Sequence, residues 1–326
     1  MKISPYLSTI FLSFIWGLYI VLSRVAVQHI PLFAVGFFSR LVAVAGLSIW
    51  VIGKGEIKKL LGMEKRQIYL LLLIGFFAFL LDASSFLGLR FSTATKGSLL
   101  LRTDIIFILI FSCFFLGERF KKIEWMSMGF MIAGALLVMN INLKEFHLTS
   151  WGDGMFIVSA FLIACNAFII KLKLREIPDT AIAFYNNLVA TSFYSLVFFL
   201  GGYSSMLVTG LERFPYLTYI LIAMGICDVF LFVTYYHSLR NLPVWVVRTL
   251  LLLIPLWSIL LGSIFLGEAL NIYQVIGMIL LLGGAAGIII TRKKPGILVL
   301  NSPKLERLEE KYVWRKKFSP VRIGKI

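Results

Sequence analysis

The sequence has few of the residues that build metal sites, disulfides and catalytic centres. Its 326 residues include three cysteines, three histidines and sixteen acidic residues. The cysteines and histidines lie far apart without metal-ligand spacing, and no phosphate-binding glycine loop or catalytic motif appears. We therefore expect no metal, no cofactor and no enzymatic activity, and we interpret the cysteines as packing residues.

Charge is scarce as well, which excludes an ordinary soluble domain. Only 15% of the residues are charged, whereas 60% are hydrophobic, and the mean hydropathy is +0.92. Ten apolar windows are long enough to cross a bilayer, which takes roughly 20 residues each. The sequence predicts an all-α integral membrane protein with ten transmembrane helices, at about 6–27, 32–52, 68–90, 95–116, 122–140, 154–171, 180–201, 216–238, 244–266 and 272–290.

The basic residues predict the orientation of these helices. With the N-terminus inside, twelve Lys and Arg residues fall in inward loops and four in outward loops. Both termini are therefore expected to be cytoplasmic, in a multi-pass protein of the cell membrane. The net charge of +16 does not indicate a nucleic acid partner, because eleven basic residues lie in the tail from Arg292 to Lys325, beside anionic lipid.

The sequence repeats itself at an offset of 150 residues. Gly88-Leu89-Arg90 aligns with Ser238-Leu239-Arg240, Phe115-Leu116-Gly117-Glu118 aligns with Phe265-Leu266-Gly267-Glu268, and Gly134 aligns with Gly284. Each unit carries five helices, an odd number, so the second unit must be inverted in the membrane. We predict a first repeat at 1–140, a linker at 141–153, a second repeat at 154–290 and a basic cytoplasmic tail at 291–326.

Inverted repeats of this kind are typical of secondary transporters, because their two halves can exchange packings of similar energy. The residues also resemble a known family, the EamA-like ten-helix branch of the drug/metabolite transporter superfamily, over about residues 6–290. The resemblance rests on the doubled Phe-Leu-Gly-Glu turn and on Trp16, Gly17, Pro31, Arg40, Pro255, Gly277, Gly283 and Gly284. It implies export or exchange of small metabolites, often amino acids, through a cavity between the halves.

One position departs from the repeat. Ile105 stands where the second copy has Pro255, and Asp104 precedes it. Because proline kinks a helix, we expect the helix of the first repeat to be less kinked. We assign structural roles to the paired glycines and acids: Gly134 and Gly284 allow close helix packing, and Glu118 and Glu268, which follow Gly117 and Gly267, cap the next helix.

Ionisable residues at membrane depth mark cavities or ion pairs. The candidates are Arg24, Arg40, Asp82, Arg102, Asp104, Asp228 and Arg248. Arg40, Asp82 and Asp104 lie at one depth, roughly 12 Å below the outer surface at ~1.5 Å per residue, so we expect one layer facing the transport pathway. Two interpretations stay open: Arg40 forms a structural pair with Asp82 or Asp104, or one carboxylate takes up a proton or contacts a substrate amine.

The sequence favours a secondary transporter of a small polar metabolite, an amino acid or a related compound, exporting it by alternating access with or without proton coupling. The equal numbers of deep Arg and Asp residues fit a zwitterion, and Trp16, Tyr235 and Trp245 are candidate aromatic wall residues. The alternatives are an exporter of cationic drugs or lipid-linked compounds, and a non-transporting scaffold or enzyme accessory. The expected partners are the solute and the bilayer, with monomer or homodimer left open.

Overall fold

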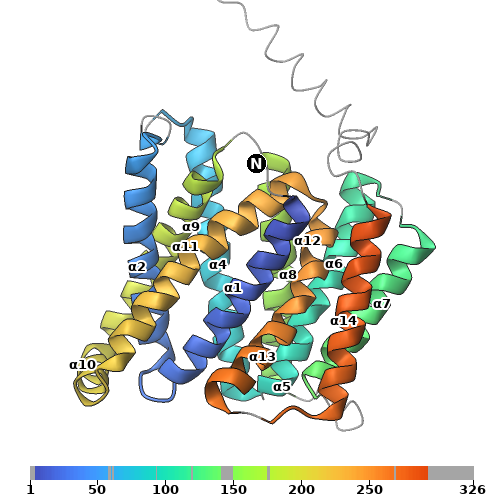
Figure 1. The fold of residues 1–326 in the computed structure, drawn as a ribbon. Coiled ribbons are helices and arrows are strands. Elements are labelled where there is room, and N and C mark those ends of the chain that lie inside the picture. The colour runs from blue at the N-terminus through green and yellow to red at the C-terminus, as the bar shows by residue number, and fades with distance from the viewer. Residues whose placement is uncertain are drawn as a thin grey trace, which may run out of the picture.

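The computed structural model describes residues 4–57, 60, 62–92, 94–118, 120–140, 150–174, 177–267 and 269–292. These residues form helices without any strand. Most of the predicted linker, the basic tail beyond Arg292 and Glu268 lie outside the described residues. The chain is therefore an all-helical bundle (Figure 1).

Eight helical spans are long and apolar enough to cross a membrane, within the described part of the chain. They lie in α1 (Pro5–Ala26), α2 (Leu32–Gly53), α4 (Lys65–Phe91), α8 (Trp151–Lys173), α9 (Asp179–Leu200), α11 (Tyr216–Asn241), the segment from α12 (Val244–Leu250) through η4 (Leu251–Leu253) to α13 (Ile254–Leu266), and α14 (Ile272–Thr291). The two remaining predicted windows hold α7 (Lys122–Val138) and the interrupted run of α5 (Ala94–Leu100), η1 (Leu101–Thr103), α6 (Asp104–Phe111) and η2 (Ser112–Leu116). A multi-pass membrane protein is thus shown, whereas the count of ten crossings stays a prediction.

Both repeats contain a helix broken at the same register. The 3₁₀ turn η1 covers Leu101–Thr103 and η4 covers Leu251–Leu253, 150 residues later. The break is present in the first repeat with Ile105 in place of Pro255, whereas the smaller kink expected there stays a prediction. The break therefore belongs to the repeat and does not depend on proline.

The paired glycines end helices and bring others together. Gly117 and Gly267 both adopt left-handed backbone, with φ of 65° and 69°, where η2 and α13 stop. In Figure 1, α6 leads toward α7 at the top of the bundle, whereas α13 joins α14 at the bottom. Helices α7 and α14 pack so closely that a Cβ on Gly134 would lie 2.7 Å from the carbonyl oxygen of Gly277.

The start of α7 is capped by a residue other than Glu118, and Asn271 caps α14, where Glu268 lies outside the described residues. Helix α7 begins at Lys122, and the Glu124 carboxylate accepts a hydrogen bond from the Lys121 amide at 2.8 Å. The side chain of Asn271 caps α14, accepting from the Tyr273 amide at 3.1 Å. Glu124, and not Glu118, therefore serves the start of α7.

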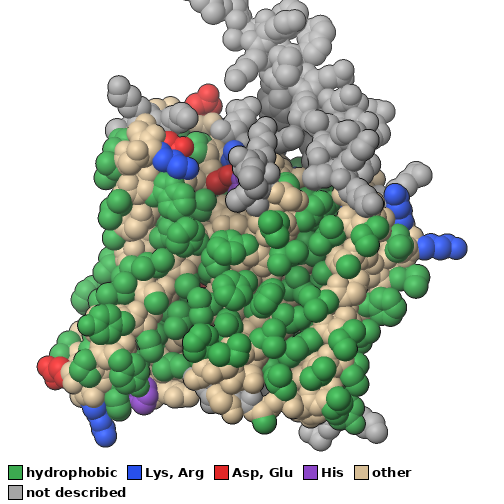
Figure 2. Space-filling view, viewed as in Figure 1, with side chains coloured by type: hydrophobic (Ala, Val, Ile, Leu, Met, Phe, Trp, Pro, Cys, Tyr) green, Lys and Arg blue, Asp and Glu red, His purple; other side chains and the backbone are tan. Residues whose placement is uncertain are grey.

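The outside of the bundle is apolar. Figure 2 shows a broad hydrophobic surface on one face, with the visible charged side chains near its upper and lower edges. Large apolar side chains are widely exposed, including Ile49 at 72% and Leu200 at 79%. A surface of this extent requires lipid contact, because water-soluble monomers rarely expose such large apolar areas.

Candidate functional site

A cavity of about 470 Å³ lies inside the bundle. Both repeats contribute to its wall, from α1, α2, α4 and η1 in the first and from α8, α9, α11, α12, η4 and α13 in the second. This volume lies in the range of small-molecule sites, about 300–1,000 Å³. The predicted candidates Trp16, Arg40, Asp82, Arg102, Asp228, Tyr235 and Arg248 all line it.

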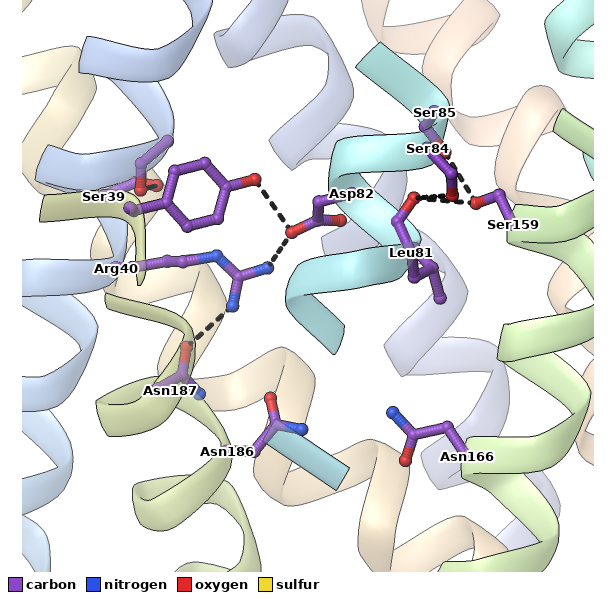
Figure 3. Close-up of polar contacts among 12 residues, drawn as sticks. Ser39, Arg40, Leu81, Asp82, Ser84, Ser85, Ser159, Asn166, Asn186 and Asn187 are labelled. Atoms are coloured by element: carbon purple, nitrogen blue, oxygen red, sulfur yellow. Dashed lines mark hydrogen bonds and ion pairs between the residues drawn. The ribbon is translucent and has the colours of Figure 1, made fainter. Parts of the chain in front are cut away.

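Arg40 and Asp82 form the ion pair that the sequence predicted as one of two choices. The Arg40 guanidinium on α2 donates to the Asp82 carboxylate on α4 at 2.7 Å (Figure 3). Tyr194 on α9 donates its hydroxyl to the same carboxylate oxygen at 2.9 Å, and its ring lies 5.3 Å from the Arg40 guanidinium. Asn187 accepts a weaker hydrogen bond from Arg40 at 3.5 Å. The pair is thus held in place from three helices.

Asp104 does not join this pair. The prediction of one layer of Arg40, Asp82 and Asp104 facing the pathway is therefore wrong for Asp104. Asp104, the first residue of α6, accepts from Nε of Arg248 on α12 at 2.8 Å and also contacts the second guanidinium nitrogen. Arg248 lines the cavity, whereas Asp104 lies behind it, 1% exposed. This second pair connects the broken helix of the first repeat to that of the second.

Two charged side chains of the cavity wall have no ion pair among the described residues. Asp228 on α11 is 5% exposed, and its Oδ2 atom has no hydrogen-bond partner there. Arg102 in η1 likewise has a buried Nε without an acceptor. The cavity wall therefore contains one acidic and one basic group without an ion pair, although Ser39 hydrogen-bonds Asp228, Arg40 lies near Asp228, and Asp104 lies near Arg102.

Comparison with known proteins identifies the family. The model of the EamA-like transporter family matches residues 3–140 and again residues 150–290. The chain belongs to the EamA-like transporter family. An uncharacterized transporter of Archaeoglobus fulgidus is 26% identical over 272 residues, covering 83% of this chain and 92% of that protein. The uncharacterized transporter YetK of Bacillus subtilis is 24% identical over 302 residues, which cover 90% of this chain and 89% of that protein.

A solved structure, described only as the crystal structure of a protein, has the same fold. It matches with a TM-score of 0.74 at 16% sequence identity and covers 89% of this chain and 97% of its own. The double family match and the transporter relatives place this EamA-like chain among membrane transporters, which suggests a protein that is not an enzyme.

Aromatic side chains complete part of the transporter's cavity wall. Trp16 on α1 and Tyr235 on α11 meet edge to face, with ring centroids 6.3 Å apart. Trp245, the third aromatic candidate, does not line the cavity. It is fully buried against Phe120, 5.1 Å away, and the Arg292 guanidinium lies 5.2 Å from its ring.

Trp245 belongs instead to a layer that closes the cavity on the side where α1 begins, at the top of Figure 1 and hereafter the N-terminal side. There Arg292 forms an ion pair with Glu124 at 2.5 Å, and its carbonyl oxygen accepts a hydrogen bond from Tyr6. The Lys171 ammonium donates to three backbone carbonyl oxygens at and just after the end of α11. They belong to Leu239 at 2.6 Å, Arg240 at 3.2 Å and Leu242 at 2.9 Å. Side chains from α1, α7, α8, α12 and the end of α14 thus hold this side shut.

The cavity extends toward the other side of the transporter. Ser23 near the end of α1 and Leu32 at the start of α2 line it there. On the N-terminal side, by contrast, its wall ends at Tyr235, Tyr236 and Arg248. The structure therefore has one closed side and one side toward which the cavity reaches.

Sequence reasoning missed several polar residues of the site. Asn166 on α8 and Asn186 on α9 line the cavity, and their amides approach the carbonyl oxygen of Ile74 at 3.3 and 3.4 Å. Tyr19 and Tyr194 also line it. Asparagine inside an apolar window is the signal that could have pointed to these helices, because an amide in lipid needs a partner.

Proposed function

We propose that this EamA-like protein is a secondary transporter that exports a small polar metabolite, an amino acid or a related compound, by alternating access. The observation that carries the proposal is the cavity of about 470 Å³, which is lined by charged and aromatic residues of both repeats. A solute held there would contact both halves, so that a change in their packing would move its access from one side to the other.

The closed layer supports this mechanism. It combines apolar packing around Trp245 with polar contacts between helices, including the Glu124–Arg292 ion pair and the hydrogen bonds of Tyr6 and Lys171. Contacts of this kind can break and re-form during a conformational cycle. In the proposed cycle the layer opens while the other end of the cavity closes.

We propose that the N-terminal side faces the cytoplasm, following the distribution of basic residues in the loops. The protein would then lie in the cell membrane with Gly117 inside and Gly267 outside. An impermeant thiol reagent applied from outside should label a cysteine placed at Asn271 and spare one placed at Lys121, both in a background without Cys113, Cys165 and Cys227. Equal labelling of both positions would contradict the inverted arrangement.

The transport activity itself is tested in proteoliposomes. Uptake and exchange of a panel of labelled metabolites are measured with and without a pH gradient, beside empty liposomes. We expect saturable exchange of a small polar solute. Absence of exchange for every member of the panel would remove the proposal, and a gradient effect would identify proton coupling.

A further inference from the structure

The six deep charges divide into two groups on different parts of the cavity. Arg40, Asp82 and Asp228, from α2, α4 and α11, comprise one base and two acids, a net charge of −1 when all are ionised. Arg102, Asp104 and Arg248, from the two broken helices, comprise two bases and one acid, a net charge of +1. The six charges sum to zero, but they form one group with a net negative charge and one with a net positive charge.

Within the acidic group, Asp228 is the member without a partner charge. Arg40 lies near enough to interact with it, but the guanidinium donates to Asp82 at 2.7 Å. Ser39 hydrogen-bonds the Asp228 carboxylate, but the Oδ2 atom of this 5% exposed residue has no hydrogen-bond partner in the described part of the chain. A buried carboxylate in this state needs a cation or a proton to offset its desolvation.

Within the basic group, Arg102 is the member without an ion pair. Its acidic neighbour, Asp104, is bound by Arg248 through two guanidinium nitrogens. Arg102 lines the cavity and has no ion pair among the described residues, so its donors can receive an anionic group. The two ion pairs thus occupy the charges that would otherwise neutralise Asp228 and Arg102.

We propose that the cavity binds a zwitterion, with the cationic group of the solute at Asp228 and its carboxylate at Arg102. This assignment rests on the proposed transport function and adds the residues that select the solute. Trp16 and Tyr235 would provide an apolar surface for the remainder of the molecule. The chemical class is an amino acid or a betaine, as opposed to an organic cation or an organic anion.

The test uses the full-length protein and solutes that differ in one charge. A first screen measures thermal stabilisation by the twenty common amino acids, betaine, choline and succinate. The best zwitterion is then compared with its decarboxylated and deaminated analogues, which for leucine are 3-methylbutylamine and 4-methylpentanoate. The variants are Asp228→Asn and Arg102→Gln, with Glu212→Gln and Arg213→Gln, both exposed on α10 (Tyr203–Arg213), as controls outside the cavity.

We expect a crossed pattern. Asp228→Asn should weaken the zwitterion and the amine by at least about tenfold and leave the carboxylate probe unchanged, the loss expected for a charge-assisted hydrogen bond. Arg102→Gln should weaken the zwitterion and the carboxylate probe and leave the amine unchanged. The two control variants should behave like the parent.

Three results would overturn the inference. The first is binding of choline or succinate with no zwitterion bound, and the second is an unchanged affinity for the zwitterion in both variants. The third is an Asp228→Asn variant that keeps its affinity but loses accumulation driven by a proton gradient, which would make Asp228 a proton site. Each of these results rejects the zwitterion site but leaves the proposed transport function in place, provided that the parent exchanges solute in proteoliposomes. If the parent exchanges no solute, the proposed function itself is rejected.

Discussion

The two ion pairs beside the cavity differ in exposure and in the parts of the molecule that they connect. Arg40 and Asp82 both belong to the first repeat, and their side chains are 13% and 22% exposed. Arg248 and Asp104 belong to different repeats and are 8% and 2% exposed. The comparison indicates that the first pair can rearrange with solute or water, whereas the second is a fixed connection between the broken helices.

The largest expected effect comes from breaking the second pair. Arg248→Gln or Asp104→Asn leaves one buried charge without its partner, which typically costs about 3–5 kcal/mol. We expect a strongly lowered melting temperature of the purified protein in detergent, with Arg213→Gln as an exposed control. The double variant should recover part of the loss, and single variants as stable as the parent would contradict a fixed connection.

The first pair should matter less for stability and more for transport. Because Asp82 is partly exposed and also accepts from Tyr194, we expect Asp82→Asn to lower stability by roughly 1–2 kcal/mol. If transport is coupled to protons through Asp82, the variant should exchange solute but lose accumulation driven by a pH gradient. If Asp82→Asn accumulates solute as fully as the parent, Asp82 does not couple transport to protons and has only a structural role.

The smallest effect concerns a carboxylate outside the membrane-spanning helices. Burial raises the pKa of Glu118 from 4.5 to about 7, although Arg292 and Lys171 lower it and Glu124 raises it further. Because the folded state then holds the proton more tightly than the unfolded state, this group should reduce stability as the pH rises from about 4.5 through 7. Melting temperatures of Glu118→Gln should show a weaker decline over this range, and an identical slope in the parent would contradict the shifted pKa.

Much of the architecture followed from the sequence because it depends on composition and spacing. The offset of 150 residues, found in the Phe-Leu-Gly-Glu turns, also relates the 3₁₀ turns at Leu101–Thr103 and Leu251–Leu253. The break occurs in the first repeat without a counterpart of Pro255. A backbone feature shared by both repeats is thus not set by one residue.

The site was predicted in part, for a geometric reason. Position along a helix gives the depth of a residue, which brought Arg40 and Asp82 together correctly. It does not give the rotation of the helix, which turns Asp104 toward Arg248 and buries Trp245 outside the cavity. Asn166 and Asn186 carry no charge, so the cost of an ionisable group at membrane depth does not reveal them.

The central claim, one cavity with alternating access, is tested most directly by following a single cavity position from both sides of the membrane. Ser85 lines the cavity, its hydroxyl lies 2.7 Å from that of Ser159, and cysteine is close to serine in size. In vesicles of known orientation, without native cysteines, an impermeant thiol reagent should label Ser85→Cys from outside at rest and from inside during solute exchange. Labelling from one side only, with and without transported solute, would contradict alternating access.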